Sequence, residues 1–511
     1  MLAKVYSSAL TGVDAYLVEV EIDLARGLPK FNIVGLPDAA VREAKERVSS
    51  AIKNSAFEFP TKKITVNLAP ADIKKEGSSL DLSIAIGILK ASSILKKDEF
   101  RNYSILGELA LDGSVRRVNG ALPIALDLKK RGVKGLIIPE ENAREASVVD
   151  DINVFPIRSL IQTVQFLNGE VSIPVYKCNL KEVLRQNSIY DMDFSEVKGQ
   201  EHVKRALEIA AAGSHNILMI GPPGVGKTML ARRIPTILPD LSLNEAIETT
   251  KLHSVTGLLS AHQALIGTRP FRSPHHTISE AGLIGGGRIP RPGEVSLSHN
   301  GVLFLDELSE FPRGVLESLR QPLEDGMITV SRALTSITYP ARFMLVAAMN
   351  PCPCGYFGDP GRECSCTPLE IQKHLNKISG PLLDRIDIHI QVAGVRRKDL
   401  LGKGVGEPSA QIKERVDRAR AIQRERFKKT TLYSNARMNP KHIRRFCKPE
   451  KEAEELLRSA IPELRLSARA YHKVLKISRT IADLEEKEKI NSSHISEALQ
   501  YRYLDRELWR R

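Results

Sequence analysis

Aromatic residues are scarce in this sequence, making up 5% of 511 residues with a single tryptophan. That scarcity argues against an aromatic-lined carbohydrate-binding surface. Collagen-like, glutamine-rich and serine-rich tracts are also missing. Apolar residues at 42% and charged residues at 27% exclude a disordered or fibrous chain. The composition is that of a globular protein, and its length favours two or three domains.

Long apolar segments and a secretion signal are missing as well. The longest apolar stretch, SIAIGILKASSIL at 83–95, is interrupted by Lys90 and is shorter than a bilayer requires. The first 24 residues alternate like a strand pair and have no basic start, apolar middle or cleavage site. We therefore expect a cytoplasmic protein with no membrane partner, in which cysteine thiols stay reduced.

Positive charge is in excess and unevenly spread. The formal net charge is +14, and residues 411–451 contain 14 Lys or Arg against 4 Asp or Glu. Such a segment is either a solvated helix face or a surface that meets a polyanion such as a nucleic acid.

Hydrophobic patterning predicts an α/β protein with three domains. Residues 1–175 interleave alternating runs with helical patterns, as in a compact α+β domain, and 176–194 read as a linker. The apolar runs within 195–393 are nearly continuous, as in a parallel sheet covered by helices on both faces. Residues 394–511 are basic and helical.

The segment GPPGVGKT at 221–228 follows the apolar run HNILMI and precedes the helical MLARRI. A glycine-rich loop between a strand and a helix wraps phosphate groups with its backbone N–H groups. Lys227 is predicted to reach the β and γ phosphates of ATP, and Thr228 to hold Mg²⁺. The phosphate-binding residues before them are Gly221, Pro222, Pro223, Gly224, Val225 and Gly226.

Polar side chains follow two further apolar runs. GVLFLDEL at 301–308 supplies Asp306, predicted to bind Mg²⁺, and Glu307, predicted to polarise the attacking water. FMLVAAMN ends at Asn350, which either orients that water or is a turn residue. Arg385 in GPLLDRID is either salt-bridged or supplied to a neighbouring subunit's site.

Taken in order, GPPGVGKT, LFLDE, AAMNP, GPLLDRID and RLSARAYHKVL resemble the AAA+ ATPases of the magnesium-chelatase-like branch. RPFRSPHH together with NPCPCGYFGD resembles the ComM/YifB family over essentially the whole chain. The resemblance implies a hexameric ring and a DNA motor for branch migration during natural transformation, working with recombination proteins. It also implies Walker A (Lys227, Thr228), Walker B (Asp306, Glu307), sensor 1 (Asn350), an arginine finger (Arg385) and sensor 2 (Arg469).

Two insertions typical of that branch can be placed by the same resemblance. Residues 255–297 correspond to a helix-2 insert, and 326–343 to a β-hairpin before sensor 1. Such loops usually face the pore of the ring, where basic and aromatic side chains contact phosphates or bases; the alternative is packing against adjacent subunits. The candidate DNA contacts are Phe271, Arg272, His275, His276, Arg288, Arg291 and Arg332.

The N-terminal segment resembles the proteolytic domain of Lon, a fold of the ribosomal S5 domain 2 type. Ser79 lies nearest the place of the nucleophile, whereas the position of the lysine base is Pro123. A serine without a base is a weak nucleophile. We therefore expect a non-catalytic scaffold, such as a DNA-binding or assembly collar.

Four of the six cysteines lie in NPCPCGYFGDPGRECSCT at 350–367. Four thiolates can complete a closed tetrahedral zinc site that holds a long loop together. The alternative is that reduced cysteines pack as small hydrophobes. The predicted zinc ligands are Cys352, Cys354, Cys364 and Cys366.

Three functions remain open at this stage. The leading one is an ATP-driven hexameric DNA translocase or helicase that uses ATP, Mg²⁺ and structural zinc. A protein-remodelling ATPase of the magnesium chelatase type is the second. An ATP-dependent protease is the third, and Pro123 opposes it.

Overall fold

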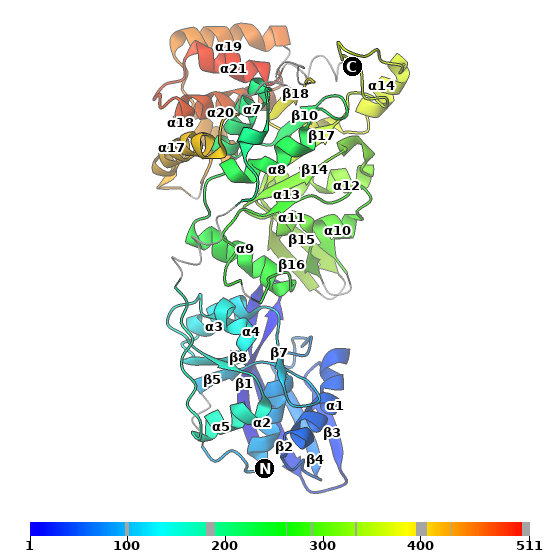
Figure 1. Cartoon of the computed structure of the whole chain (residues 1–511), viewed down its shortest axis with the longest axis vertical. Helices are drawn as coiled ribbons and strands as arrows, with labels where there is room; N and C mark the ends of the chain where they lie inside the picture. Colours follow the sequence, from blue (N-terminus) through cyan, green and yellow to red (C-terminus); the bar gives the residue numbers. More distant parts are fainter. Residues whose placement is uncertain are drawn as a thin grey trace. The chain divides into compact units, whose positions relative to one another are not determined.

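The computed structural model describes residues 1–97, 102–179, 190–261, 263–287, 290–332, 335–394, 406–430, 432–464 and 466–502. The chain divides into two compact units (Figure 1). Residues 1–187 and 242–267 form the N-terminal unit. Residues 188–241 and 268–511 form the second unit, called the ATPase unit below because it contains the phosphate loop predicted to bind ATP.

A seven-stranded mixed sheet forms the centre of the N-terminal unit, in the order β3-β4-β2-β1-β5-β8-β9. Strand β2 pairs antiparallel with β1 on one side and with β4 on the other. The remaining pairs, β3 with β4, β1 with β5, β5 with β8 and β8 with β9, are parallel. The strands are β1 (Leu2–Thr11), β2 (Asp14–Ala25), β3 (Lys30–Val34), β4 (Lys63–Ala69), β5 (Tyr103–Ile105), β8 (Gly135–Pro139) and β9 (Asn153–Ile157). A separate short pair joins β6 (Glu108–Leu109) to β7 (Val115–Arg116).

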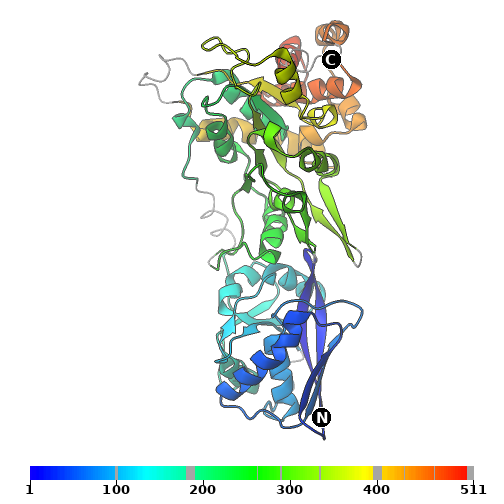
Figure 2. The same cartoon turned by 90° about the vertical axis from the view of Figure 1, so that its right-hand side faces the viewer.

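Helices cover both faces of this sheet. In β8, Ile137 faces the hydrophobic cluster that contains α1 and α2, while Leu136 and Ile138 face the cluster that contains α3 and α4, because successive side chains of a strand point to opposite faces. Figure 2 shows α1 and α2 (blue) along one side of β1 and β2 (dark blue). The helices are α1 (Ala39–Asn54), α2 (Asp81–Ala91), α3 (Ala121–Lys130), α4 (Glu140–Ala146) and α5 (Leu160–Asn168).

Residues 242–267 join the N-terminal unit although they lie far along the sequence. They include α9 (Leu243–Val255), whose N-terminus is closed by a capping box between Ser242 and Glu245. Leu265 is fully buried in the cluster with α3 and α4. The buried carboxylate of Glu145 accepts hydrogen bonds from the N–H of Leu122 at 2.9 Å and from the hydroxyl of Ser254. The sequence predicts one domain over 195–393, whereas residues 242–267 belong to the N-terminal unit in the structure.

A five-stranded sheet of parallel pairs forms the centre of the ATPase unit, in the order β11-β14-β17-β10-β18. Its strands are β10 (Ile217–Ile220), β11 (Phe271–Arg272), β14 (Val302–Leu305), β17 (Met344–Met349) and β18 (Ile388–Gln391). Strands β10, β14 and β17 are buried at every position, as their continuous apolar sequences predict. All carboxyl ends of these strands lie at one edge, where ligands bind in open α/β sheets.

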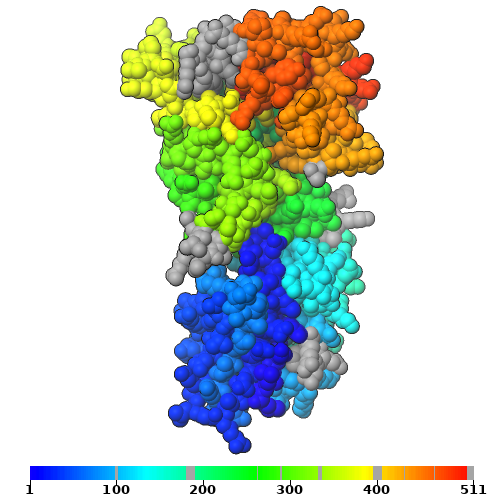
Figure 3. Space-filling view, turned by 180° about the vertical axis from the view of Figure 1, so that it is seen from behind, coloured from blue at the N-terminus to red at the C-terminus, as the bar shows by residue number. Residues whose placement is uncertain are grey.

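Helices surround this sheet and continue into the C-terminal part of the chain. The helices of residues 409–500 are called the lid below. One hydrophobic cluster includes Ile217 and Val346 of the sheet and Val474 and Ile481 of α20 (Ala468–Leu484), so the lid shares a core with the sheet. Figure 3 shows the lid helices (orange) as one continuous surface. The helices that complete the core and lid are α7 (Glu201–Gly213), α8 (Lys227–Ile237), α17 (Ser409–Phe427), α18 (Pro440–Phe446), α19 (Lys451–Leu464), α20 (Ala468–Leu484) and α21 (Ser492–Gln500).

Shorter elements connect the strands of the ATPase unit. The predicted hairpin is present as β15 (Met327–Arg332) paired antiparallel with β16 (Thr335–Pro340). A second pair joins β12 (Gly285–Gly286) to β13 (Arg291–Pro292). The short helices are α10 (Glu280–Ile284), α11 (Glu294–Leu297), α12 (Arg313–Ser318), α13 (Arg320–Asp325), α14 (Pro368–Leu375) and α15 (Gly380–Leu383).

The fold class is the predicted one: an N-terminal α+β unit, a parallel-sheet phosphate-loop core and a helical lid. Across the described ranges, no helix combines the length and apolar character needed to cross a bilayer.

Candidate functional site

The phosphate loop runs from the end of β10 into the first turn of α8. Gly224 and Gly226 have φ values of 78° and 92°, in the left-handed region that favours glycine. Lys227 is the first residue of α8, so the loop ends at a helix N-terminus. Helix N-termini expose unpaired N–H groups and favour bound anions. The predicted strand, loop and helix are therefore all present.

The ammonium group of Lys227 lies folded back over the loop. Its Nζ donates to the carbonyls of Gly221 at 2.6 Å and Pro222 at 2.9 Å and to Oδ1 of Asn350 at 3.0 Å. Burial lowers the pKa of Lys227 to about 8, although the carboxylates of Asp306 and Glu307 oppose the shift. A phosphate group at this place would stabilise the charged ammonium form.

The strand-tip residues meet as the sequence predicts. The hydroxyl of Thr228 donates to Oδ2 of Asp306 at 2.6 Å, bringing together a hydroxyl and a carboxylate. Hard oxygen donors of this kind suit Mg²⁺, so Thr228 and Asp306 fit the predicted metal. Glu307 has φ 51° and ψ 48°, and its Oε2 lies 3.2 Å from Nδ1 of His276.

Arg385 and Arg469 meet at a carboxylate that the sequence analysis did not single out. Oε1 of Glu324 in α13 lies 2.5 Å from Nη2 of Arg385 and 3.5 Å from Nη2 of Arg469. The side chain of Arg385 is only 10% exposed, whereas that of Arg469 is 59% exposed. Within the described ranges, neither side chain has a hydrogen bond or ion pair to the phosphate loop. The salt-bridge alternative for Arg385 is therefore present in the isolated chain.

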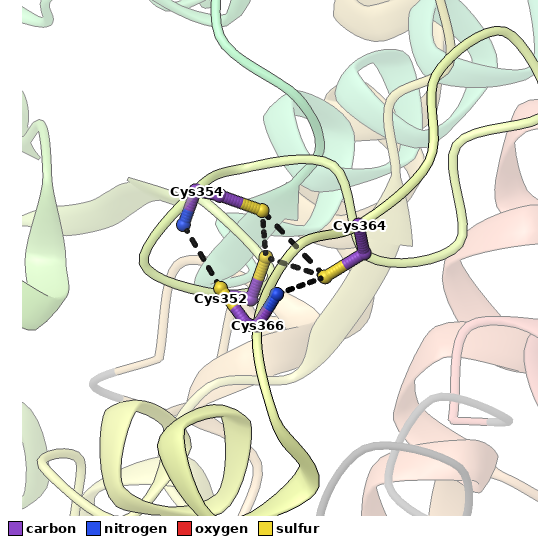
Figure 4. Close-up of side chains that lie close together, drawn as sticks. All are labelled: Cys352, Cys354, Cys364 and Cys366. Carbon is purple, nitrogen blue, oxygen red and sulfur yellow. Dashed lines mark hydrogen bonds between the residues drawn. The ribbon is translucent and has the colours of Figure 1, made fainter.

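Four sulfur atoms converge in the loop after β17 (Figure 4). The sulfur of Cys352 lies 3.4 Å from that of Cys354 and 3.7 Å from that of Cys364, and the last two are 3.5 Å apart. With Cys366 included, all four lie within 4.8 Å of one another. A tetrahedral zinc site with Zn–S bonds of 2.3 Å places sulfur atoms about 3.8 Å apart. The donor set therefore fits a thiolate-bound zinc ion.

Backbone N–H groups point at these sulfurs. The amide of Tyr356 contributes most to lowering the pKa of the Cys354 thiol to about 5. The hydrogen bond from the Cys354 amide favours the thiolate of Cys366, but burial and the neighbouring thiols raise its pKa to about 12. The low pKa of Cys354 favours its thiolate, whereas the pKa values of Cys364 and Cys366 are raised, because clustered negative charges need a cation.

The candidate DNA contacts divide into two groups. Phe271 stacks on Phe304 with ring centroids 5.9 Å apart, and Arg272 forms two hydrogen bonds of 2.6 Å to Glu294. These two, with His276 at Glu307, are engaged within the unit. His275 and Arg291 are exposed. Arg288 lies outside the described residues, and Arg332 is the last residue of β15.

The basic segment 411–451 also divides. Lys413, Arg415 and Arg426 form ion pairs, and Arg420 is buried. Part of the positive charge is therefore structural. The exposed members are Arg418, Arg424, Lys428, Lys429, Lys441, Arg444, Arg445, Lys448 and Lys451.

The N-terminal unit places Ser79 before α2 and Pro123 within α3. The carbonyl of Ser79 accepts from the N–H of Gly107 at 3.0 Å. A buried lysine lies nearby in the sequence, Lys75, but its ammonium group donates to the carbonyls of Pro70 and Ile73. The scaffold role of this unit stays a prediction.

Sequence reasoning missed two functional contacts of this site. His276 was assigned to DNA, and only its position after β11 could have suggested that it meets a carboxylate at a strand tip. Glu324 gave no signal, since a glutamate at the end of an amphipathic helix is ordinary.

Family models match the chain in three consecutive segments. Subunit ChlI of Mg-chelatase matches residues 20–142. Magnesium chelatase, subunit ChlI, matches residues 193–400, and its C-terminal model matches residues 406–502.

Full-length relatives give the same result. Competence protein ComM of Haemophilus influenzae is 48% identical over 99% of this chain and 98% of its own length. Uncharacterized protein YifB of Escherichia coli is 45% identical over 99% of this chain and 98% of its own length. The magnesium-chelatase 38 kDa subunit of Rhodobacter capsulatus is 26% identical over 40% of this chain and 60% of its own. The chain belongs to the ComM/YifB family of magnesium-chelatase-like AAA+ proteins.

Proposed function

We propose that this chain is an ATP-hydrolysing motor that assembles as a hexamer and drives branch migration of DNA in the cytoplasm, during natural transformation and homologous recombination. The observation that carries the proposal is the convergence of Lys227, Thr228, Asp306 and Asn350 at the carboxyl edge of a parallel sheet. The role in transformation rests on the relative named competence protein ComM.

Each residue of the nucleotide site has a distinct task. Lys227 exchanges its carbonyl partners for the β and γ phosphates, and Thr228 and Asp306 hold Mg²⁺. Bound Mg²⁺ neutralises phosphate charge as the terminal phosphoryl group is transferred. Glu307, which is 59% exposed, polarises the attacking water, and Asn350 orients it. Gly224, Val225 and Gly226 supply backbone N–H donors, which Pro222 and Pro223 lack.

A neighbouring subunit completes the site. Arg385 lies at Glu324 together with Arg469 and has no hydrogen bond or ion pair to the phosphate loop among the described residues, as expected of an arginine that serves the next subunit. On ring assembly, Arg385 leaves Glu324 and meets the terminal phosphate of the neighbour, and Arg469 acts as sensor 2. Charge on the transferring group is stabilised by such an arginine.

DNA contacts come from the insert, the hairpin and the lid. His275 and Arg291 are exposed, and the hairpin β15–β16 carries Arg332. Exposed lysines and arginines of α17 and α18 add positive charge. Neutralisation of phosphates by such side chains gives affinity that falls as salt rises. The four cysteines hold a structural Zn²⁺ in the loop after β17.

Mixed rings test the shared site. Lys227→Ala removes the phosphate contact, and Arg385→Ala removes the arginine offered to the neighbour, so each variant alone is expected to be inactive. Together they form some interfaces with an intact Lys227 and an intact Arg385, and ATP hydrolysis is expected to return. Arg458→Ala, at an exposed arginine of α19, is the control. If no activity returned in mixed rings, the finger between subunits would be refuted.

A branch-migration assay tests the proposed reaction. Wild-type protein with ATP is expected to convert a labelled branched DNA into its products, and Lys227→Ala is expected to leave it unchanged. ATP hydrolysis that responded to a protein partner and to no DNA would instead favour a remodelling ATPase of the magnesium chelatase type.

A further inference from the structure

The cysteine cluster is tied to the phosphate loop through the strand that precedes it. Cys352 follows Asn350 by two residues, and Oδ1 of Asn350 accepts a hydrogen bond of 3.0 Å from Lys227. Cys352 is fully buried and lies three residues after the last residue of β17, Met349. Only Pro351 therefore separates the first metal ligand from Asn350 of the nucleotide site.

A turn inside the cluster also contacts the phosphate loop directly. Gly355 has φ 89°, and its N–H donates to the carbonyl of Cys352 at 3.0 Å. A Cβ atom at Gly355 would lie only 2.6 Å from Cδ of Pro223, the third residue of GPPGVGKT. The two loops thus meet without room for one extra methyl group.

The C-terminal end of the cysteine loop leads into α14, which also contacts Asn350. Cys366 directly precedes Thr367, which forms a capping box with Glu370 and starts α14. In α14, His374 is 6% exposed, and its Nε2 lies 3.0 Å from the carbonyl oxygen of Asn350. Asn350 is consequently held by the cluster through the main chain on one side and through α14 on the other.

We infer that metal binding by the four cysteines and nucleotide binding by the phosphate loop are thermodynamically coupled, each favouring the other. Apart from Cys352, the cysteines are partly exposed, and a loop of this kind has little core of its own. A thiolate-bound Zn²⁺ fixes the turn at Gly355 and the start of α14, and with them Pro223 and Asn350. This inference rests on the proposed nucleotide site.

Coupling of this kind is reciprocal, so it can be measured from either side. In one arm, the full-length zinc-loaded protein is challenged with a zinc-selective chelator, with and without Mg²⁺ and the analogue AMP-PNP. We expect AMP-PNP to raise the apparent zinc affinity by roughly 5-fold or more, within the range usual for coupled sites. In the other arm, removing zinc is expected to weaken AMP-PNP binding by the same factor.

Two glycine variants locate the coupling. Gly355→Ala keeps all four thiols but pushes the turn against Pro223. Gly358→Ala is the matched control: its φ is 75°, and its added Cβ would have Nε2 of Gln391 at 3.9 Å as its nearest neighbour. Both variants are expected to bind zinc. The coupling factor is expected to fall toward 1 in Gly355→Ala and to persist in Gly358→Ala.

The outcomes separate the inference from the function on which it rests. Wild-type protein that binds zinc and AMP-PNP with a coupling factor of 1 would overturn the inference and leave the proposed function intact. Protein purified without chelator that holds well under one zinc per chain would overturn the metal site. Zinc-loaded protein that fails to bind AMP-PNP would overturn the proposed function itself.

Discussion

Replacing Leu265 with alanine tests the assignment of residues 242–267 to the N-terminal unit. Leu265 is 0% exposed in the cluster with α3 and α4, although the magnesium chelatase family model of residues 193–400 spans it. Truncating a fully buried leucine costs about 3 kcal/mol through lost transfer energy and a residual cavity. At 1.4 kcal/mol per factor of ten, this is on the order of a 100-fold change in a local opening equilibrium.

Hydrogen exchange read out by mass spectrometry measures this effect segment by segment. Amides of β8 (135–139) and β9 (153–157) are expected to exchange on the order of 100-fold faster in Leu265→Ala, while those of β10 and β17 keep their protection. The matched control is Leu303→Ala in β14, also 0% exposed, which should have the opposite pattern. Faster exchange confined to β10 and β17 in Leu265→Ala would refute the assignment.

Three further predictions concern single side chains. His276→Ala removes the 3.2 Å contact between His276 and Glu307. The kcat of ATP hydrolysis should fall by roughly tenfold, a fraction of what a general base supplies, while the Kd of ATP stays the same. An unchanged kcat would show that His276 has no part in the site. Burial raises the pKa of Asp81 from 3.8 to about 6 against the opposing pull of Arg47, so folded protein binds more protons in that window. The contribution of Asp81 to stability therefore falls as pH rises from 3.8 to about 6. The difference in the free energy of unfolding between wild type and Asp81→Asn should change over this range, and a constant difference would contradict this. Asp483→Ala leaves Arg479, which is buried, and Arg426, which is largely buried, without their shared carboxylate. The free energy of unfolding in denaturant should fall by about 3–5 kcal/mol, and a loss below about 1 kcal/mol would contradict this.

The local pattern predicted the sheet and the residues at its edge. Continuous apolar runs identified β10, β14 and β17, because strands buried on both faces have no polar positions. Each run ends in a polar residue or a glycine loop, and parallel strands bring those ends together. The meeting of Lys227 with Asn350, and of Thr228 with Asp306, followed from that geometry.

Contacts between segments distant in sequence could not be predicted in this way. The burial of Leu265 among residues of α3 and α4 depends on how the chain crosses between units, and hydrophobic periodicity carries no such information. The approach of Gly355 to Pro223 is a matter of loop conformation, for which the sequence offers only turn residues. The sequence allowed two interpretations of Arg385, a salt bridge or a role in a neighbouring subunit's site. Its partner in the isolated chain, Glu324, is known only from the structure.

The central claim is that ATP hydrolysis at Lys227, Asp306 and Glu307 is coupled to DNA. We would measure hydrolysis by the purified protein with no DNA and with single-stranded, duplex and branched DNA, across a salt series, with Lys227→Ala as the blank. The account predicts stimulation by DNA that weakens as salt rises, because phosphate contacts release counterions. Hydrolysis indifferent to every DNA at low salt, with the ring assembled, would contradict it.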